Sequence, residues 1–246
     1  MKRALITGGQ QGIGFGIARA LHGAGFDIAL TAELPPDAGP VQAALAKLPG
    51  ARYVQHDLAR VDGVAALLDA VGPVDCLVSN AGVPARIRGD MLEMTADSFD
   101  FVMGINLRGA FFLAQEVARR MLAVPTETYR SLLFVTSVSA SMVSVERAEY
   151  CLSKSAAAMM AQLFAVRLAA QGIGVFDLRP GIIETGMTAG VRDKYTGLIA
   201  GGLVPAARWG LPSDVGAVAV PLALGQLAFA TGAVIPVDGG LSISRL

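Results

Sequence analysis

The chain has 246 residues, of which 53% are apolar and 16% are charged, and its mean hydropathy is +0.54. This composition supplies a large apolar core and contains too few charges for a disordered chain. Twenty basic and twenty acidic side chains give a net charge of zero, which excludes the basic excess that binding a nucleic acid requires.

Two cysteines and two histidines are too few for a disulfide framework or a thiolate metal site. We therefore expect a cytoplasmic protein without a metal. The uncharged run at residues 215–237 has the length of a membrane span, but its glycines, prolines and alanines favour a buried helix, a loop and a strand.

Short apolar runs alternate with helical stretches along the chain. The runs predict seven strands, at residues 3–6, 28–31, 53–55, 74–79, 132–136, 174–178 and 233–237. Helices are predicted at residues 13–23, 41–48, 61–71, 96–123, 149–170 and 213–224, while residues 185–208 have no clear assignment. Continuous apolar strands separated by helices are typical of an α/β fold, with a doubly wound, mostly parallel sheet covered by helices on both faces. No linker divides the chain, which predicts a single domain over residues 1–246.

A glycine-rich turn directly follows the first predicted strand. It reads Thr7-Gly8-Gly9-Gln10-Gln11-Gly12-Ile13-Gly14 and leads into a helix. Small residues at Gly8, Gly12 and Gly14 let the backbone approach a pyrophosphate, which backbone N–H groups and the helix N-terminus bind. This pattern indicates a dinucleotide site of the Rossmann type, although glycine-rich turns also serve close packing alone.

A second group of polar residues consists of Ser137, Tyr150 and Lys154. Tyr150 and Lys154 are four residues apart, so they lie on one face of a helix, one turn from each other. A cation at that distance favours the phenolate form of the tyrosine, which suits it to transfer protons.

Together with further motifs, these residues resemble the short-chain dehydrogenase/reductase family in its single-domain branch, from end to end. The glycine loop matches the family's TGxxxGxG motif. Asp57-Leu58 matches the position that contacts the adenine, and Asn80-Ala81-Gly82 matches the NAG motif. Asn106 falls at the family's catalytic asparagine, Ser137 has the family's spacing to Tyr150, and Pro180-Gly181 with Thr185 matches the segment that holds the nicotinamide carboxamide.

The resemblance implies four catalytic residues: Asn106, Ser137, Tyr150 and Lys154. Tyr150 would be the general acid or base, and Ser137 would hydrogen-bond the substrate oxygen. Lys154 would bind the nicotinamide ribose, and Asn106 would hold a water in a proton relay. The cofactor-binding residues that it implies are Gly8, Gln11, Gly12, Ile13, Gly14, Glu33, Asp57, Leu58, Asn80, Ala81, Gly82, Tyr150, Lys154, Pro180, Gly181, Ile183 and Thr185.

The charges near the second strand favour NAD(H) over NADP(H). Neither the glycine loop nor residues 31–36 contain a cation for a 2′-phosphate, and Glu33 would repel one. Ala32 departs from the family pattern, because it stands where NAD-preferring relatives place an aspartate, and this departure leaves two orientations open for Glu33, toward the ribose or away from it.

The implied activity is the interconversion of a ketone and a secondary alcohol by hydride transfer. Two alternatives remain: a 3-oxoacyl-[acyl-carrier-protein] reductase of fatty-acid synthesis, which the chain resembles most, and a non-enzymatic dinucleotide sensor. Residues 185–208 contain apolar side chains that suit a substrate lid or an oligomer contact. The resemblance also implies a homotetramer assembled through residues 215–237 and a small-molecule substrate, with no membrane or nucleic-acid partner.

Overall fold

A single parallel sheet of seven strands organises the computed structural model, which describes residues 1–245. The strand order is β3-β2-β1-β4-β5-β6-β7. The strands are β1 (Arg3–Thr7), β2 (Asp27–Ala32), β3 (Arg52–Gln55), β4 (Cys76–Ser79), β5 (Arg130–Val135), β6 (Ile173–Pro180) and β7 (Val234–Val237). The predicted α/β fold with a doubly wound sheet is confirmed, and all seven predicted strands are present with bounds shifted by a few residues.

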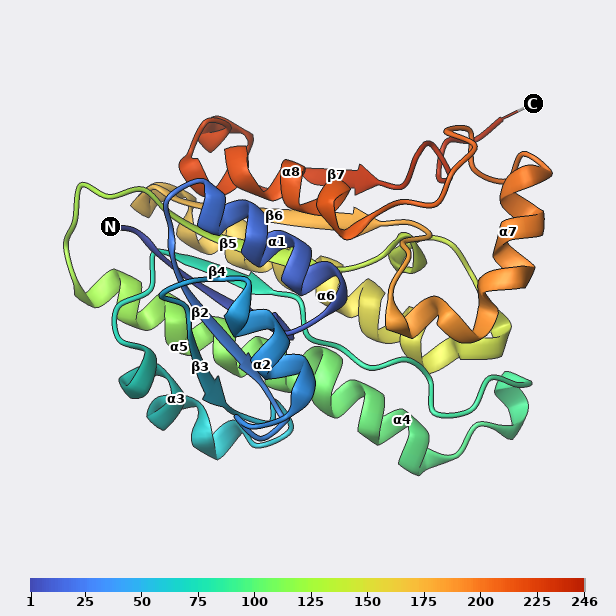
Figure 1. Cartoon of the computed structure of the whole chain (residues 1–246), viewed down its shortest axis with the longest axis horizontal. Coiled ribbons are helices and arrows are strands. Elements are labelled where there is room, and N and C mark those ends of the chain that lie inside the picture. Colours follow the sequence, from blue (N-terminus) through green and yellow to red (C-terminus); the bar gives the residue numbers. More distant parts are fainter. Residues whose placement is uncertain (246) are drawn as a thin grey trace.

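Helices cover both faces of this sheet (Figure 1). Side chains alternate along each strand, so Ala4 and Ile6 pack on one face while Leu5 packs on the other. One face is covered by α1 (Gly12–Gly23), α2 (Gly39–Ala46) and α8 (Pro212–Leu224). The other is covered by α3 (Val64–Val71), α5 (Ala110–Ala123) and α6 (Ala148–Leu168). Burial on both faces explains why the strands are continuously apolar.

The helix predicted at residues 96–123 is interrupted. It begins as α4 (Ala96–Met103), widens into a π-helical turn at Gly104–Gly109 and continues as α5. Gly109 lies in this turn where a Cβ atom would be 2.1 Å from the carbonyl oxygen of Leu58, so only a glycine permits this approach. The turn contains Asn106, which it directs into the protein.

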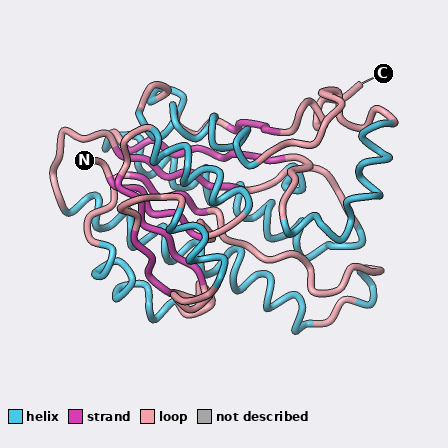
Figure 2. Tube along the Cα trace, in the orientation of Figure 1, coloured by secondary structure: helices cyan, strands magenta, loops and turns pink. Residues whose placement is uncertain are grey.

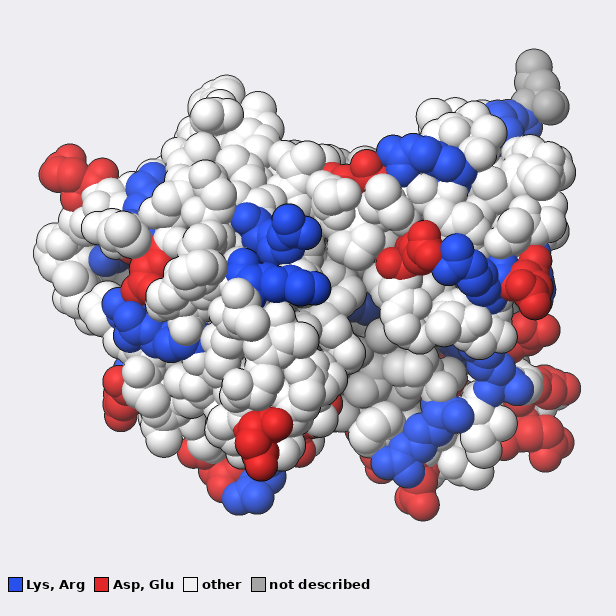
Figure 3. Space-filling view, viewed as in Figure 1, with Lys and Arg blue, Asp and Glu red and all other residues white. Residues whose placement is uncertain are grey.

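The segment at residues 185–208, which had no clear assignment from its pattern, contains a further helix, α7 (Arg192–Ala200). Figures 1 and 2 show α4 and α7 extending beyond the carboxyl ends of the strands, where loops also gather. In open parallel sheets, ligands bind at this edge. Acidic and basic side chains are interspersed on the face drawn in Figure 3, with broad uncharged areas between them.

Pro221 lies inside α8, as the sequence indicates, and the helix continues through it to Leu224. Within residues 1–245, no helix combines the length and apolar character needed to cross a membrane.

Candidate active site

The glycine loop folds tightly over the end of β1. Gly8 and Gly12 have φ angles of +64° and +54°, which residues with a Cβ atom rarely adopt. A Cβ atom on Gly14 would lie 2.4 Å from the carbonyl oxygen of Gly8 and 2.5 Å from Nδ2 of Asn80. The helix therefore begins in direct contact with the loop, and the backbone N–H groups of the first turn remain open to a ligand.

The ends of β1 and β4 are joined by Thr7 and Asn80. The Thr7 hydroxyl oxygen accepts hydrogen bonds from the backbone N–H groups of Asn80 and Ala81, both at 2.9 Å. The Asn80 side chain donates to the Thr7 carbonyl oxygen, also at 2.9 Å. The Asn80-Ala81-Gly82 segment is thereby fixed against the glycine loop.

Two buried polar atoms beside this loop have no hydrogen-bond partner among residues 1–245. They are Oε1 of Gln10 and Oγ1 of Thr31, in residues that are 6% and 1% exposed. Unpaired buried polar atoms are uncommon in proteins. Together with a cradle that excludes side chains, they fit a bound polar ligand, and a nicotinamide dinucleotide meets this description.

The ends of β2 and β3 carry the two predicted acidic positions. Glu33 follows β2 and is exposed. The Tyr53 hydroxyl donates to the carbonyl oxygens of Ala32 and Leu34. Burial, the larger cause, and the negative charge of Glu33, the smaller one, raise the pKa of Tyr53 to about 12. Asp57 is exposed and accepts from the N–H of Ala59 at 2.9 Å. Both carboxylates thus lie at the edge expected for the adenosine half of a dinucleotide.

His56 precedes Asp57 and is buried. Burial lowers its pKa, against the opposing effect of Asp57 and Asp62, and its Nε2 has no hydrogen-bond partner among the described residues. Leu58 is also buried, against the π-helical turn.

The predicted nicotinamide segment lies across the glycine loop. A Cβ atom on Gly12 would be 3.4 Å from Cγ2 of Thr185, so the two segments are in contact. Ile183 is buried and pairs with Gly210 in an isolated parallel bridge. Gly181, directly after Pro180 of β6, approaches Asp238 so closely that a Cβ atom would lie 2.7 Å from that of Asp238.

Lys154 and Tyr150 lie one turn apart on α6, as their spacing predicts. The Lys154 ammonium nitrogen is 5.7 Å from the Tyr150 ring centroid and donates to the carbonyl oxygen of Val135 at 3.0 Å. A Cβ atom on Gly82 would be 3.1 Å from Oδ1 of Asn106 and 3.6 Å from Nζ of Lys154. The structure therefore brings Gly82, Asn106, Tyr150 and Lys154 together beside the glycine loop.

Asn106 holds the loop after β4 to α6. Its Oδ1 accepts from the N–H of Val83 at 2.7 Å, and its Nδ2 donates to the Val83 carbonyl oxygen at 3.0 Å. Nδ2 also donates to Oγ of Ser153 at 3.1 Å, and that hydroxyl donates to the carbonyl oxygen of Tyr150 at 2.8 Å. Sequence reasoning missed Ser153, because its partners come from segments far apart in the chain.

Ser137 follows β5 and is 8% exposed. Its Oγ accepts from the N–H of Ser139 at 3.0 Å, which leaves its own proton for another acceptor. Val138, the next residue, packs in a small apolar cluster with Ile199, Val204 and Leu241. Ile199 belongs to residues 185–208, the segment expected to form a lid or an oligomer contact, and its side chain is buried in this cluster.

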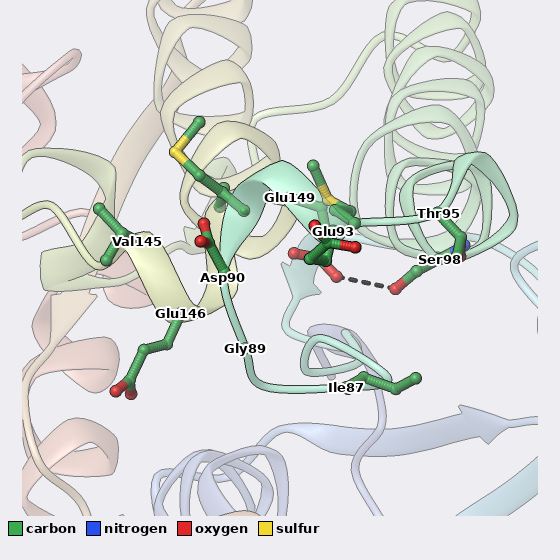
Figure 4. Close-up of a pocket in the computed structure, with 12 residues that line it drawn as sticks. Ile87, Gly89, Asp90, Glu93, Thr95, Ser98, Val145, Glu146 and Glu149 are labelled. Carbon is green, nitrogen blue, oxygen red and sulfur yellow. Dashed lines mark hydrogen bonds between the residues drawn. The ribbon is translucent and has the colours of Figure 1, made fainter.

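A pocket of about 80 Å³ lies beside the start of α6 and has several acidic residues in its lining (Figure 4). Figure 4 shows Ser98 of α4 directed at Glu149, to which its hydroxyl donates at 2.8 Å. Glu149 is 3% exposed, so this bond secures the turn that precedes Tyr150 to α4. The neighbouring Arg86 is stacked on the Phe101 ring, with its Cζ 3.9 Å from the ring centroid.

The guanidinium of Arg147 lies over the Tyr150 ring, with its Cζ 5.5 Å from the ring centroid. The sequence held a signal for this contact, since residues three apart at a helix start share a face.

Known proteins resemble this chain over its full length. A family model described as "Enoyl-(Acyl carrier protein) reductase" matches residues 8–242. A 3-oxoacyl-[acyl-carrier protein] reductase from Brucella melitensis, solved in complex with NAD, is 47% identical, with a TM-score of 0.94 and coverage of 100% of this chain and 98% of that one. A putative 2-deoxy-D-gluconate 3-dehydrogenase from Agrobacterium tumefaciens with bound NADP is 30% identical, with a TM-score of 0.86 over 98% and 96% of the two chains.

Among curated relatives, 3-oxoacyl-[acyl-carrier-protein] reductase MabA of Mycobacterium bovis is 33% identical over 99% of this chain and 94% of its own length. The 2-dehydro-3-deoxy-D-gluconate 5-dehydrogenase of Escherichia coli is 32% identical over 97% and 94%. The chain therefore belongs to the short-chain dehydrogenase/reductase family and is a nicotinamide-dinucleotide-dependent oxidoreductase that interconverts ketones and alcohols.

Proposed function

We propose that the chain is an NAD-dependent dehydrogenase of a small secondary alcohol, also active in the direction of ketone reduction, with Tyr150 as the general acid and base. The main support for this proposal is that Tyr150, Lys154 and Asn106 lie close together next to the glycine loop. The Asn80-Ala81-Gly82 segment joins the two parts, because Asn80 contacts Gly8 while Gly82 contacts Asn106 and Lys154. The residue that we propose as the proton donor thus lies near the loop that we propose to bind the dinucleotide.

In this mechanism the cofactor supplies or accepts the hydride when it is bound. Tyr150 gives its phenolic proton to the substrate oxygen in reduction and removes it in oxidation. Ser137 donates a hydrogen bond to the same oxygen as charge develops on it. Lys154, with one donor fixed on Val135, has further N–H groups for the ribose hydroxyls and for polarising Tyr150. Asn106 keeps this face of α6 in register with the loop after β4 and retains one acceptor site on Oδ1 for a relay water.

The glycine loop and the first turn of α1 would bind the pyrophosphate, through the backbone at Gly8, Gln11, Gly12, Ile13 and Gly14. Asp57 and Leu58 would contact the adenine, and Pro180, Gly181, Ile183 and Thr185 the nicotinamide carboxamide. The segment at residues 185–208 would close over the substrate, with the exposed Met187 and Leu198 facing it. In this proposal the cofactor-binding residues and the segment at residues 185–208 belong to one domain over residues 1–246.

We expect NAD to be preferred over NADP by about tenfold or more in kcat/KM. Glu33 repels a 2′-phosphate by on the order of 1–3 kcal/mol, and about 1.4 kcal/mol corresponds to tenfold. Steady-state rates with both cofactors, measured across a panel of ketones and secondary alcohols, check this expectation. Glu33→Gln should reduce the ratio of kcat/KM with NAD to that with NADP. Asp37 is also exposed in the segment after β2, and Asp37→Asn should leave this ratio unchanged.

Two outcomes would contradict these assignments. A clear preference for NADPH would overturn the role of Glu33. Dinucleotide binding without turnover of any compound in a broad panel would favour the dinucleotide-sensing alternative over an enzyme.

A second candidate function is 3-oxoacyl-[acyl-carrier-protein] reduction, which the names of the Brucella and Mycobacterium relatives favour. An acidic carrier protein requires a basic docking surface. Gln171 near the end of α6 is exposed but uncharged. Arg130 is turned inward: its guanidinium donates to the carbonyl oxygen of Val124 at 2.7 Å and lies 3.9 Å from Asp75. These features favour a small-molecule substrate, and an acyl-carrier surrogate in the same panel tests the alternative.

We also propose a homotetramer. On α6, four exposed apolar side chains form one stripe at helical spacing: Leu152, Met159, Leu163 and Val166. Away from this stripe, Leu227 and Phe229 after α8 are exposed, as is Val234 at the start of the edge strand β7. Two separate self-complementary interfaces generate a tetramer with three two-fold axes.

Sedimentation of the purified chain should therefore give about four times the chain mass, and Val166→Glu should reduce it to a dimer. Leu92→Glu, at an exposed leucine outside both patches, should remain a tetramer. A monomer at micromolar concentration would refute the assembly.

A further inference from the structure

Arg147 is a charged residue at the catalytic tyrosine that the proposed mechanism does not use. It directly precedes α6, one helical turn before Tyr150, and its Cζ is 5.5 Å from the centroid of that ring. Its Nε is buried and has no hydrogen-bond partner among residues 1–245. Within the same residues, no carboxylate lies close enough to form an ion pair with it.

A buried guanidinium N–H group without an acceptor is costly, and proteins normally pair it with a carboxylate or a carbonyl oxygen. Acidic residues do lie nearby, but they are engaged or directed elsewhere. Glu149 accepts the hydrogen bond from Ser98. Glu146 is exposed, and its side chain in Figure 4 extends toward the outside of the turn. The missing acceptor of Arg147 is therefore not supplied by its neighbours.

The turn that carries Arg147 is held in place. The N–H of Gly89, in the loop after β4, donates to the carbonyl oxygen of Glu146 at 3.2 Å. Arg86 in that loop is exposed and stacks on the Phe101 ring, and Arg88 is exposed to solvent. Of Arg86, Arg88 and Arg147, it is Arg147 whose guanidinium lies over the Tyr150 ring and has a buried Nε without a partner among the described residues.

We propose that Arg147 binds a carboxylate of the substrate, so that the chain acts on a hydroxy acid and its oxo acid. The planar fork of a guanidinium matches two carboxylate oxygens and supplies charge-assisted hydrogen bonds. With the carboxylate at Arg147 and the reacting oxygen at Tyr150 and Ser137, one molecule spans the site and is oriented at both ends. This inference rests on the proposed dehydrogenase function and names its substrate class. A carrier-bound thioester has no free carboxylate for this position.

The test compares each acid with its own methyl ester, using 3-oxobutanoate and 4-oxopentanoate, together with a neutral ketone, cyclohexanone. We expect the wild-type enzyme to favour the acids through a lower KM. Arg147→Gln should raise KM for the acids by about 10- to 100-fold, which corresponds to about 1.4–2.8 kcal/mol, and should change the rates with the esters by less than about threefold. Arg147→Lys, which keeps the charge but loses the fork, should give an intermediate KM.

Arg88→Gln is the matched control, since it removes a cation from the adjacent loop without touching Tyr150, and we expect it to leave the acid preference intact. NAD titration and thermal melting of each variant verify that it is folded. Equal losses on acids and esters in Arg147→Gln and Arg147→Lys, or a wild-type enzyme that favours the esters, would overturn the role of Arg147 while the dehydrogenase function stands. If no compound in the set or in the wider panel is turned over, the proposed function itself fails.

Discussion

Tyr150→Phe should lower kcat by about 10²- to 10⁴-fold while NAD binds with nearly unchanged affinity. The substitution removes only the phenolic oxygen, which carries the transferred proton in the proposed mechanism. The surrounding contacts do not depend on it: Lys154 remains bonded to Val135, and Asn106 remains bonded to Val83 and Ser153. Steady-state kinetics on a confirmed substrate measure the loss, and a fluorescence titration measures NAD binding.

The neighbouring Cys151 provides the control for this experiment. Its side chain lies about 100° around the helix from Tyr150, near the carbonyl oxygens of Met142 and Ser144. Cys151→Ser should therefore keep activity within a few-fold of the wild type. If Tyr150→Phe retained wild-type turnover, another group would have to donate the proton and the assignment of Tyr150 would be abandoned.

Gly14→Ala should abolish measurable NAD binding and destabilise the fold by about 1–3 kcal/mol. The added methyl group would lie 2.4 Å from the Gly8 carbonyl oxygen and 2.5 Å from the Asn80 side chain. The glycine loop or the start of α1 must then move, and either movement disturbs the N–H groups expected to bind the pyrophosphate. Thermal melting and NAD titration of the purified variant measure both effects.

Gly23→Ala tests whether this effect is local, since Gly23 ends the same helix and a Cβ atom there would meet no atom within 4 Å. That variant should melt at or above the wild-type temperature, because alanine favours helix formation over glycine. A Gly14→Ala variant that binds NAD as the wild type does would show that the cofactor does not use this turn.

The architecture could be predicted because its determinants are local in the chain. Strands such as β1 contain consecutive apolar residues, and helices such as α1 follow a glycine-rich turn, so the order of elements follows directly from the sequence. The pairing of Tyr150 with Lys154 was also predictable, since a spacing of four residues fixes their relation on any helix.

Other features depend on contacts between distant segments and could not be predicted in this way. The π-helical turn around Asn106 has no periodic signal, and its fit depends on Leu58 and Val83 from two other loops. The helix α7 is short, with charged and polar residues mixed among the apolar ones, so the pattern of residues 192–200 did not distinguish it from a loop. The missing partner of Arg147 is likewise a property of three-dimensional packing alone.

The contact between α1 and α8 has a consequence for the order in which the protein matures. Gly16 and Gly216 let these helices touch backbone to backbone, since a Cβ atom on Gly16 would be 2.4 Å from the carbonyl oxygen of Pro212. The helix α1, which follows the proposed dinucleotide-binding loop, is thus supported by residues about 200 positions later in the chain. During synthesis on the ribosome, β1 and the glycine loop emerge first but lack this support until α8 has followed. A nascent chain should consequently acquire the ability to retain dinucleotide only after α8 has left the ribosome.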